Sequence, residues 1–364
     1  MISFGMSEEQ ELVRDAMHEF AEDAIRPIAR DCDEEAAIPA DFLETAWTLG
    51  LTSTQIPEAF GGAGEERGVV TNAILLEELA FGDASLAMAA LAPSLFANAI
   101  IDQATEGQKG ALLPHFCGDS FVTGSLAVSE PGALSDASRP RTRAEQKGKS
   151  FILSGRKTFV TFGDRASHFL VTAQLDDDLA AFIVPRGADG LTIGEVEKKM
   201  GLHALATTGL ELERVEVGPD ALLGGPEGAD VQQLLNLSRV GLAAVMLGVS
   251  RAVLEYCVPY SKDRIAFDEP ISKKQAIAFR LAEMHIEVHA LRQLVWRAAS
   301  LLDQGEDATR AAWQARAYAA DKSMWITDSG VQVLGGHGFI REHPVEMWFR
   351  NARTLGVLEA MVTL

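Results

Sequence analysis

The chain has 364 residues, of which 47% are hydrophobic and 23% charged, and its formal net charge is −20 at pH 7. This composition is that of a folded globular protein with room for two or three domains, and it excludes a disordered chain, a collagen-like fibre and a small disulfide scaffold. With 52 acidic residues against 32 basic ones, we expect neither nucleic acid nor anionic lipid as a partner.

The three cysteines, Cys32, Cys117 and Cys257, fit no metal-binding or CxxC spacing. They predict free thiols in a reducing compartment, and we expect a cytoplasmic protein. The N-terminus lacks the basic start and apolar core of a secretory signal. The uncharged run 84–101 approaches the length of a membrane span, but Pro93 interrupts it, so we expect two short buried helices and no membrane span.

Residues 1–118 are expected to form an N-terminal α-helical domain. Ser7 and Gln10 have the spacing of a capping box, and the apolar residues after them recur at helical intervals. A further short helix is expected over 41–50, where Gly50 would end it.

Residues 119–226 are expected to form a middle β domain, because short apolar runs alternate there with Gly, Pro and Asp clusters. The strand candidates are 121–128, 151–153, 169–173, 181–184 and 210–217. Residues 176–178 are three aspartates, and we expect a hairpin turn rather than a calcium site, because the ligand spacing does not alternate. Since helices do not alternate with these strands, a doubly wound sheet is not expected.

Residues 227–364 return to helical periodicity and are expected to form a C-terminal helical bundle. Apolar residues from Ile277 to Val295 follow steps of four and three, which is typical of the buried stripe of a bundle helix. His285 and His289 lie four apart on this helix, but no third ligand can be named, so we expect no metal. The pattern predicts an α+β fold that is mainly α, and it names no reaction, because the common nucleotide and hydrolase signatures are absent.

Four segments carry more specific information. They are AVSEPGALSD at 127–136, GRKTFVTFG at 155–163, RIAFDEPISKKQ at 264–275, and QVLGGHGFIREHPVEMWFRNAR at 332–353, which is followed by LEAM at 358–361. In order and spacing they resemble the TEPGAGSD, GxKxWITN, RxxFGxPI…Q and QxxGGxGFxREyPvExxyRDA…YEGT segments of the acyl-CoA dehydrogenase family. The resemblance covers nearly the whole chain.

The resemblance implies an N-terminal helical domain, a middle β-barrel-like domain, a C-terminal four-helix bundle and the cofactor FAD. The residues implied to contact FAD are Ser129, Phe159, Thr161, Arg264, Phe267, Gln275, Gln332, Gly335 and Gly336. Arg264 would reach the pyrophosphate of an FAD bound mainly by a neighbouring subunit, which implies a homodimer or homotetramer. The residues implied to contact the substrate are Ser135, Arg239 and Leu358.

Glu359 matches the position of the family's catalytic base. The implied reaction is the α,β-dehydrogenation of acyl-CoA to trans-2-enoyl-CoA, in which Glu359 removes the α proton and N5 of FAD takes the β hydride. The implied electron acceptor is an electron-transferring flavoprotein. Some related enzymes carry the base at the position of Ser238, and a serine cannot do that task.

The chain also departs from the family pattern. The departures are Leu134, Phe162, Asp268, Ala360 and Met361, together with an end at Leu364 that leaves out the family's usual final helix. They keep two alternatives open. One is a specialised dehydrogenase or oxidase of secondary metabolism, acting for example on an acyl-carrier-protein thioester. The other is a catalytically silent paralogue that binds acyl-CoA.

Overall fold

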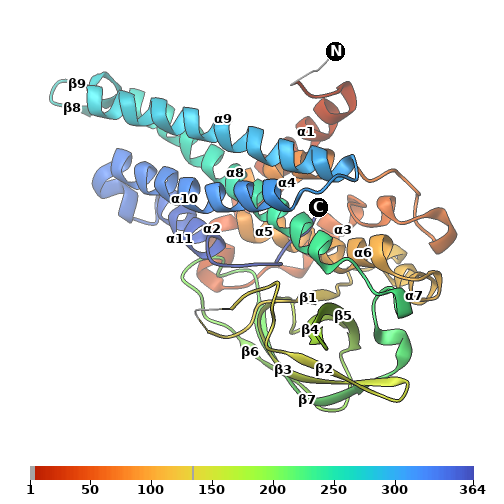
Figure 1. Cartoon of the computed structure of the whole chain (residues 1–364). Coiled ribbons are helices and arrows are strands. Elements are labelled where there is room, and N and C mark those ends of the chain that lie inside the picture. Colours follow the sequence, from red (N-terminus) through yellow and green to blue (C-terminus); the bar gives the residue numbers. More distant parts are fainter. Residues whose placement is uncertain (1–4, 133–134) are drawn as a thin grey trace.

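The structure, a computed structural model, describes residues 5–132 and 135–364. Leu134, one of the departures from the family pattern, lies outside the described residues. Helices come first along the chain, a sheet follows, and further helices complete it (Figure 1). The sheet lies below both helical groups, and the C-terminal segment runs between the helices and the sheet (Figure 1).

The N-terminal helices begin at the predicted cap. Ser7 and Gln10 form the reciprocal capping box at the start of the first helix. The uncharged run 84–101 divides, as predicted, into two helices that meet at a 45° bend, and Pro93 lies in the first turn of the second. The elements are α1 (Glu8–Phe20), a π-helical turn (Ala21–Ile25), α2 (Arg26–Glu35), α3 (Ala40–Thr48), α4 (Val69–Gly82), α5 (Ala84–Ala90), α6 (Ala92–Gln103) and α7 (Glu106–Leu112).

The middle strands form a seven-stranded sheet with the order β1-β4-β2-β3-β7-β6, in which β5 pairs with the other edge of β4. The turn between β4 and β5 contains Asp176 at φ 52°, as predicted for this aspartate run. The strands are β1 (Ser125–Ala127), β2 (Arg143–Lys147), β3 (Ser150–Thr161), β4 (His168–Leu175), β5 (Asp178–Pro185), β6 (Leu191–Val196) and β7 (Thr207–Val217). The first is shorter than predicted. The sequence did not reveal β2, whose residues are mostly polar and exposed, or β6, of whose six residues four are exposed.

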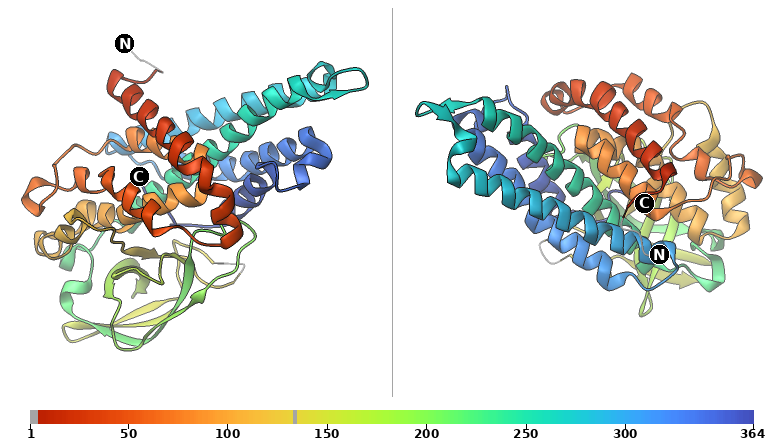
Figure 2. Two further views of the ribbon diagram at one scale, coloured as in Figure 1. Left: turned by 180° about the vertical axis from the view of Figure 1, so that it is seen from behind. Right: turned by 90° about the horizontal axis from the view of Figure 1, so that it is seen from above.

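The C-terminal helices form a bundle of three long helices and one short one. They are α8 (Val231–Asp263), α9 (Gln275–Asp303), α10 (Thr309–Leu334) and α11 (Val345–Leu355). A small hairpin of β8 (Ile265–Ala266) and β9 (Glu269–Pro270) joins α8 to α9 at the end that points away from the sheet (Figure 2). By length and apolar composition alone α8 could cross a membrane, but 94% of its apolar window is buried, as in the core helix of a bundle.

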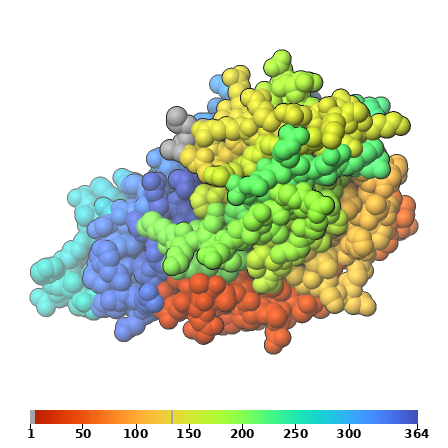
Figure 3. All heavy atoms as spheres, turned by 90° about the horizontal axis from the view of Figure 1, so that it is seen from below, coloured from red at the N-terminus to blue at the C-terminus, as the bar shows by residue number. Residues whose placement is uncertain are grey.

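One hydrophobic core joins the N-terminal helices to the bundle, and the sheet has a core of its own. Viewed from below, the strands cover the middle of the face, with bundle helices and N-terminal helices on either side (Figure 3). Leu358, Met361, Val362 and Leu364 belong to the helical core although they follow the last helix. The segment after α11 is therefore fixed where the bundle meets the sheet.

Candidate functional site

Two strand ends meet the segment after α11. Ser129 follows β1, and its hydroxyl donates a hydrogen bond to the carbonyl of Glu359 at 3.3 Å. Thr161 ends β3, and its buried hydroxyl donates to the carbonyl of Met361 at 3.4 Å. Residues 230 and 200 positions apart are thus brought together, and both hydroxyls assigned to FAD by resemblance lie beside the segment that bears Glu359.

The carboxylate of Glu359 faces a buried cation. Arg239, in α8, is only 6% exposed, and its Nε lies 3.4 Å from Oε2 of Glu359. Neither atom has a hydrogen-bond partner within the described part of the chain, so the contact is one of charge alone. Removing a guanidinium from water is costly, and Glu359 offsets part of that cost.

A second buried guanidinium holds the backbone just before Glu359. Arg316, in α10, donates hydrogen bonds to the carbonyls of Leu355 (2.8 Å) and Leu358 (2.6 Å). Burial lowers the pKa of Arg316, while the negative charge of Glu359 opposes that shift. We did not predict Arg316 from the sequence. The available signal was a cation on the stripe of Ala312, Ala315 and Ala319, which the helical repeat places toward the core.

Phe159 is held in an unusual conformation. Its φ is +55°, in the left-handed region that aromatic residues rarely adopt. The N–H of Phe159 donates to Oε2 of Glu197 at 3.0 Å, and the hydroxyl of Thr158 donates to the other oxygen of the same carboxylate. Glu197 thus fixes the half-buried ring beside Thr161, a role that the sequence did not indicate.

The remaining residues assigned to FAD lie at the far end of the bundle. They are Arg264, Phe267, Gln275, Gln332, Gly335 and Gly336. All six are exposed, and Phe267 is 89% exposed in the β8–β9 turn. Tyr260 links the ends of α8 and α10, because its hydroxyl lies 2.8 Å from Nδ1 of His337. His337 therefore holds the turn after α10 against the end of α8.

The two groups are widely separated within one chain. Arg264 follows Arg239 by 25 positions along α8, which corresponds to about 37 Å of helix. The structure brings together Glu359, Arg239, Leu358, Ser129, Phe159 and Thr161, and it separates the other six from them.

Ser135 and Leu358, which the resemblance assigns to the substrate, lie in different surroundings. Ser135 lies at the surface, where its hydroxyl accepts a hydrogen bond from the N–H of Glu130 at 3.1 Å. Leu358 is buried in the helical core, next to Glu359. Among the departures, Phe162 is buried edge-to-face against Phe121 and is therefore a core residue. The roles of Ser135 and Leu358 toward a substrate stay predictions.

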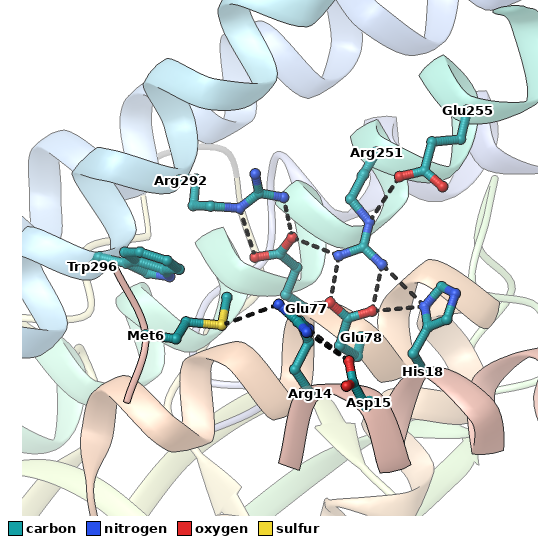
Figure 4. A pocket seen from close by; sticks show the side chains of 10 residues that line it. All are labelled: Met6, Arg14, Asp15, His18, Glu77, Glu78, Arg251, Glu255, Arg292 and Trp296. Atoms are coloured by element: carbon teal, nitrogen blue, oxygen red, sulfur yellow. Dashed lines mark hydrogen bonds and ion pairs between the residues drawn. The ribbon is translucent and has the colours of Figure 1, made fainter. Parts of the chain in front are cut away.

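A second cluster of charges lies elsewhere on α8. A cavity of about 450 Å³ is lined by residues of α1, α4, α8 and α9 (Figure 4). There Glu77 accepts from both Arg251 (2.9 Å) and Arg292 (2.6 Å), while Glu78 pairs with Arg251 and with His18. Arg251 lies 12 positions beyond Arg239, about 18 Å along the helix. This cluster ties four helices together and is separate from Glu359.

The described residues contain no group of three or more His, Cys, Asp or Glu that could hold a metal ion. His285 and His289 pack edge to face, with ring centroids 4.4 Å apart, and the three cysteines are free thiols.

The residues beside Glu359 fit a flavin ring by their chemistry. Two hydroxyl donors, on Ser129 and Thr161, and the aromatic ring of Phe159 come from the ends of β1 and β3. The hydrogen bonds that both hydroxyls make, at 3.3 and 3.4 Å, are long. Replacing them by hydrogen bonds to a ligand therefore costs little free energy.

Comparison with known families gives three adjacent matches. The chain matches the acyl-CoA dehydrogenase N-terminal domain over residues 7–119, the middle domain over 125–215 and the C-terminal domain over 228–359. The last match includes Glu359.

Individual relatives are similar over almost their full length. The mitochondrial short-chain specific acyl-CoA dehydrogenase of Bos taurus is 36% identical over 98% of this chain and 88% of its own. The structure of butyryl-CoA dehydrogenase from Megasphaera elsdenii is 32% identical with a TM-score of 0.87, covering 97% of this chain and 95% of that one. The prolyl acyl carrier protein oxidase AnaB is 25% identical with a TM-score of 0.87, covering 96% and 95%.

Proposed function

The chain belongs to the acyl-CoA dehydrogenase family and is an oxidoreductase of that kind, and from this premise we propose that it dehydrogenates an acyl thioester with Glu359 as the base. The observation that carries the proposal is the contact of the Glu359 carboxylate with buried Arg239, next to the hydroxyls of Ser129 and Thr161. The substrate class is acyl-CoA, and the names of the relatives favour a short acyl chain.

Glu359 removes the proton from the carbon next to the thioester carbonyl. The carbonyl makes that carbon acidic, and the N–H of Glu359 would donate to the carbonyl oxygen as negative charge develops there. Arg239 holds the carboxylate by charge, and Arg316 fixes the backbone before it. A base held in this way spends little energy on reorganisation during proton transfer.

FAD, when bound, supplies the acceptor for the hydride from the β carbon. Ser129 and Thr161 would hold the polar edge of its ring, and Phe159 would lie against the ring. To do so, both hydroxyls would exchange the carbonyls of Glu359 and Met361 for acceptors on the ring. We propose an electron-transferring flavoprotein as the partner that receives the electrons.

We also propose that the site is completed by a second copy of the chain. Arg264 and the exposed residues around it lie about 37 Å along α8 from Arg239, so they serve the FAD of a neighbour in a homodimer or homotetramer. A planar guanidinium suits a pyrophosphate, because it can donate two parallel hydrogen bonds.

The test is anaerobic mixing of the FAD-loaded protein with a panel of thioesters while the visible flavin absorbance is followed. The panel holds short, medium and branched acyl-CoAs and the corresponding acyl-carrier-protein thioesters. We expect bleaching by a short acyl-CoA and a loss of rate of roughly a thousandfold in Glu359→Gln, the scale of a removed general base. Gln keeps the shape of the side chain, so Glu359→Gln should still bind FAD and the thioester, and a lost rate then reports the missing base.

The other outcomes discriminate the alternatives. Bleaching only by carrier-protein thioesters would favour a specialised oxidase, which the similarity to AnaB supports. If the protein binds FAD and acyl-CoA but nothing bleaches, the dehydrogenase proposal is wrong and a silent binding protein remains.

A further inference from the structure

A buried ion pair includes the residue that follows Ser129 in the chain. Lys157, in β3, is 1% exposed, and Glu130, next to Ser129, is 7% exposed. Nζ of Lys157 lies 3.0 Å from Oε1 of Glu130. The lysine of GRKTFVTFG and the glutamate of the SEPG turn belong to two of the segments found in the sequence. Neither residue has a role in the reaction described above.

Lys157 joins three parts of the sheet. Besides Glu130, its Nζ donates to the carbonyl of Val128 at 3.2 Å and to the hydroxyl of Thr172 in β4 at 3.3 Å. The carbonyl of Ser129 itself accepts from the N–H of Thr158 at 2.9 Å. The backbone is therefore bonded to β3 at Val128 and at Ser129, and the side chain of Glu130 is bonded to it as well.

Glu130 also bonds to residues on the other side of the turn. Its carboxylate accepts from the N–H of Arg141 (2.7 Å) and from both the N–H (2.9 Å) and the hydroxyl (2.6 Å) of Thr142. With Lys157 this makes four donors for one carboxylate, so its charge is fully compensated inside the protein. Glu130, before the turn, is thus held to Arg141 and Thr142, after it.

An ion pair is a costly way to fill a core. Two apolar side chains of similar volume are often at least as stable as a buried pair, so stability alone does not account for Lys157 and Glu130. The pair instead gives two segments a fixed position relative to each other. It fixes the segment that bears Ser129 to the strand that bears Phe159 and Thr161, and so sets the spacing of the three groups assigned to the flavin.

We propose that Lys157 and Glu130 are positioning residues for the cofactor, which hold the hydroxyl of Ser129 at the distance from Thr161 that FAD binding requires. The inference rests on the proposed function, because it takes Ser129 and Thr161 as the flavin contacts. It adds a dependence of FAD affinity on the protonation of one buried lysine.

The direction of the pH effect follows from burial. Desolvation lowers the pKa of Lys157 to about 8, against the opposing effect of Glu130. Burial alone would raise the pKa of Glu130, but Lys157 and Thr142 outweigh it and hold that pKa below its ordinary value. Glu130 is the charged group that faces Lys157. As pH rises through about 8, Lys157 loses its charge while Glu130 keeps its own, and the restraint on Ser129 weakens.

The experiment measures the dissociation constant of FAD from the full-length apoprotein by flavin fluorescence at pH 7, 8 and 9. It compares the unmodified chain with Lys157→Met and Arg156→Met. Arg156 is the adjacent residue of β3, but its side chain is exposed and pairs with Glu211 across the strands, so it is the matched control. Met preserves much of the length of the lysine stem.

We expect Lys157→Met to weaken FAD binding at pH 7 by roughly ten- to a hundredfold, the range typical of partners that orient a ligating group. Its affinity should then change little up to pH 9. The unmodified chain and Arg156→Met should bind equally at pH 7 and lose roughly tenfold between pH 7 and pH 9. A merely structural lysine would not make the pH dependence disappear.

Three results would overturn the inference: equal affinity of Lys157→Met and Arg156→Met at pH 7, the same pH dependence in both, or a flat profile of the unmodified chain. The last needs no variant, so it decides the question even if Lys157→Met does not fold. Failure of the unmodified chain to bind FAD at any pH would instead contradict the proposed function.

Discussion

The region around Glu359 and the far end of the bundle are built in opposite ways. Around Glu359, one chain contributes a carboxylate from the segment after α11, two buried guanidiniums from α8 and α10, and two hydroxyls from the ends of β1 and β3. At the far end, Arg264, Phe267 and the residues near Gly335 lie exposed on one chain. The comparison teaches that one chain alone assembles the groups around Glu359, whereas Arg264 and its neighbours are left open to solvent, as our proposal of a second subunit requires.

Arg239→Met should disturb only the first region. The change removes the charge partner of Glu359 and leaves Ser129 and Thr161 in place. We expect the rate of flavin bleaching to fall by roughly a hundredfold, because truncating one member of a buried charge pair leaves the other unpaired and less well oriented. The affinity for FAD should stay within about twofold. Stopped-flow bleaching and fluorescence titration measure the two quantities, and a large loss of FAD affinity would show that the two regions are not separable in this way.

Arg264→Met should disturb only the second region. We expect FAD affinity to fall by about tenfold, since one bidentate phosphate contact is lost, while the bleaching rate at saturating FAD stays unchanged.

Mixing subunits sharpens this prediction. Glu359→Gln and Arg264→Met chains are unfolded, combined and reassembled at limiting FAD. If Arg264 serves a neighbour, each mixed pair has one site with an intact base and an intact Arg264, so about a quarter of the sites regain activity. If Arg264 serves its own chain, no site regains both groups, and the activity of the mixture stays at the average of the two variants.

The sequence predicted the fold where local signals were strong. The capping box at Ser7, the break near Pro93 and the apolar stripe of α9 depend on residues within a few turns of one another, and all three are present. The short, mostly exposed strands β2 and β6 were missed, because they are stabilised by pairing with β3 and β7 and not by a pattern of their own.

Only part of the site was predicted, because some of its contacts join residues that are far apart in the sequence. Motif resemblance placed Glu359, Ser129 and Thr161, and the structure brings these residues together. Arg316 and Glu197 act through contacts that span 42 and 38 positions of sequence, and no spacing rule predicts such contacts. Lys157 lies at an inward position of β3, and a charge there indicates a buried partner. Only the fold shows that the partner is Glu130.

The smallest effect that we predict concerns Asp268, beside the exposed Phe267 at the far end of the bundle. Asp268 has φ +66° and stands where the family pattern has glycine, so Asp268→Gly relaxes the backbone and also removes a negative charge near Arg264. We expect FAD to bind about threefold more tightly at low ionic strength, because exposed charges act weakly and are screened by salt. Asp268→Asn is the matched control: it removes the charge but keeps a side chain that tolerates the left-handed region. If the phosphates of a neighbour's FAD approach this hairpin, Asn gives most of the gain, and the gain disappears at high salt. A gain with Gly alone, independent of salt, would assign the effect to the backbone and would place the phosphates away from Arg264.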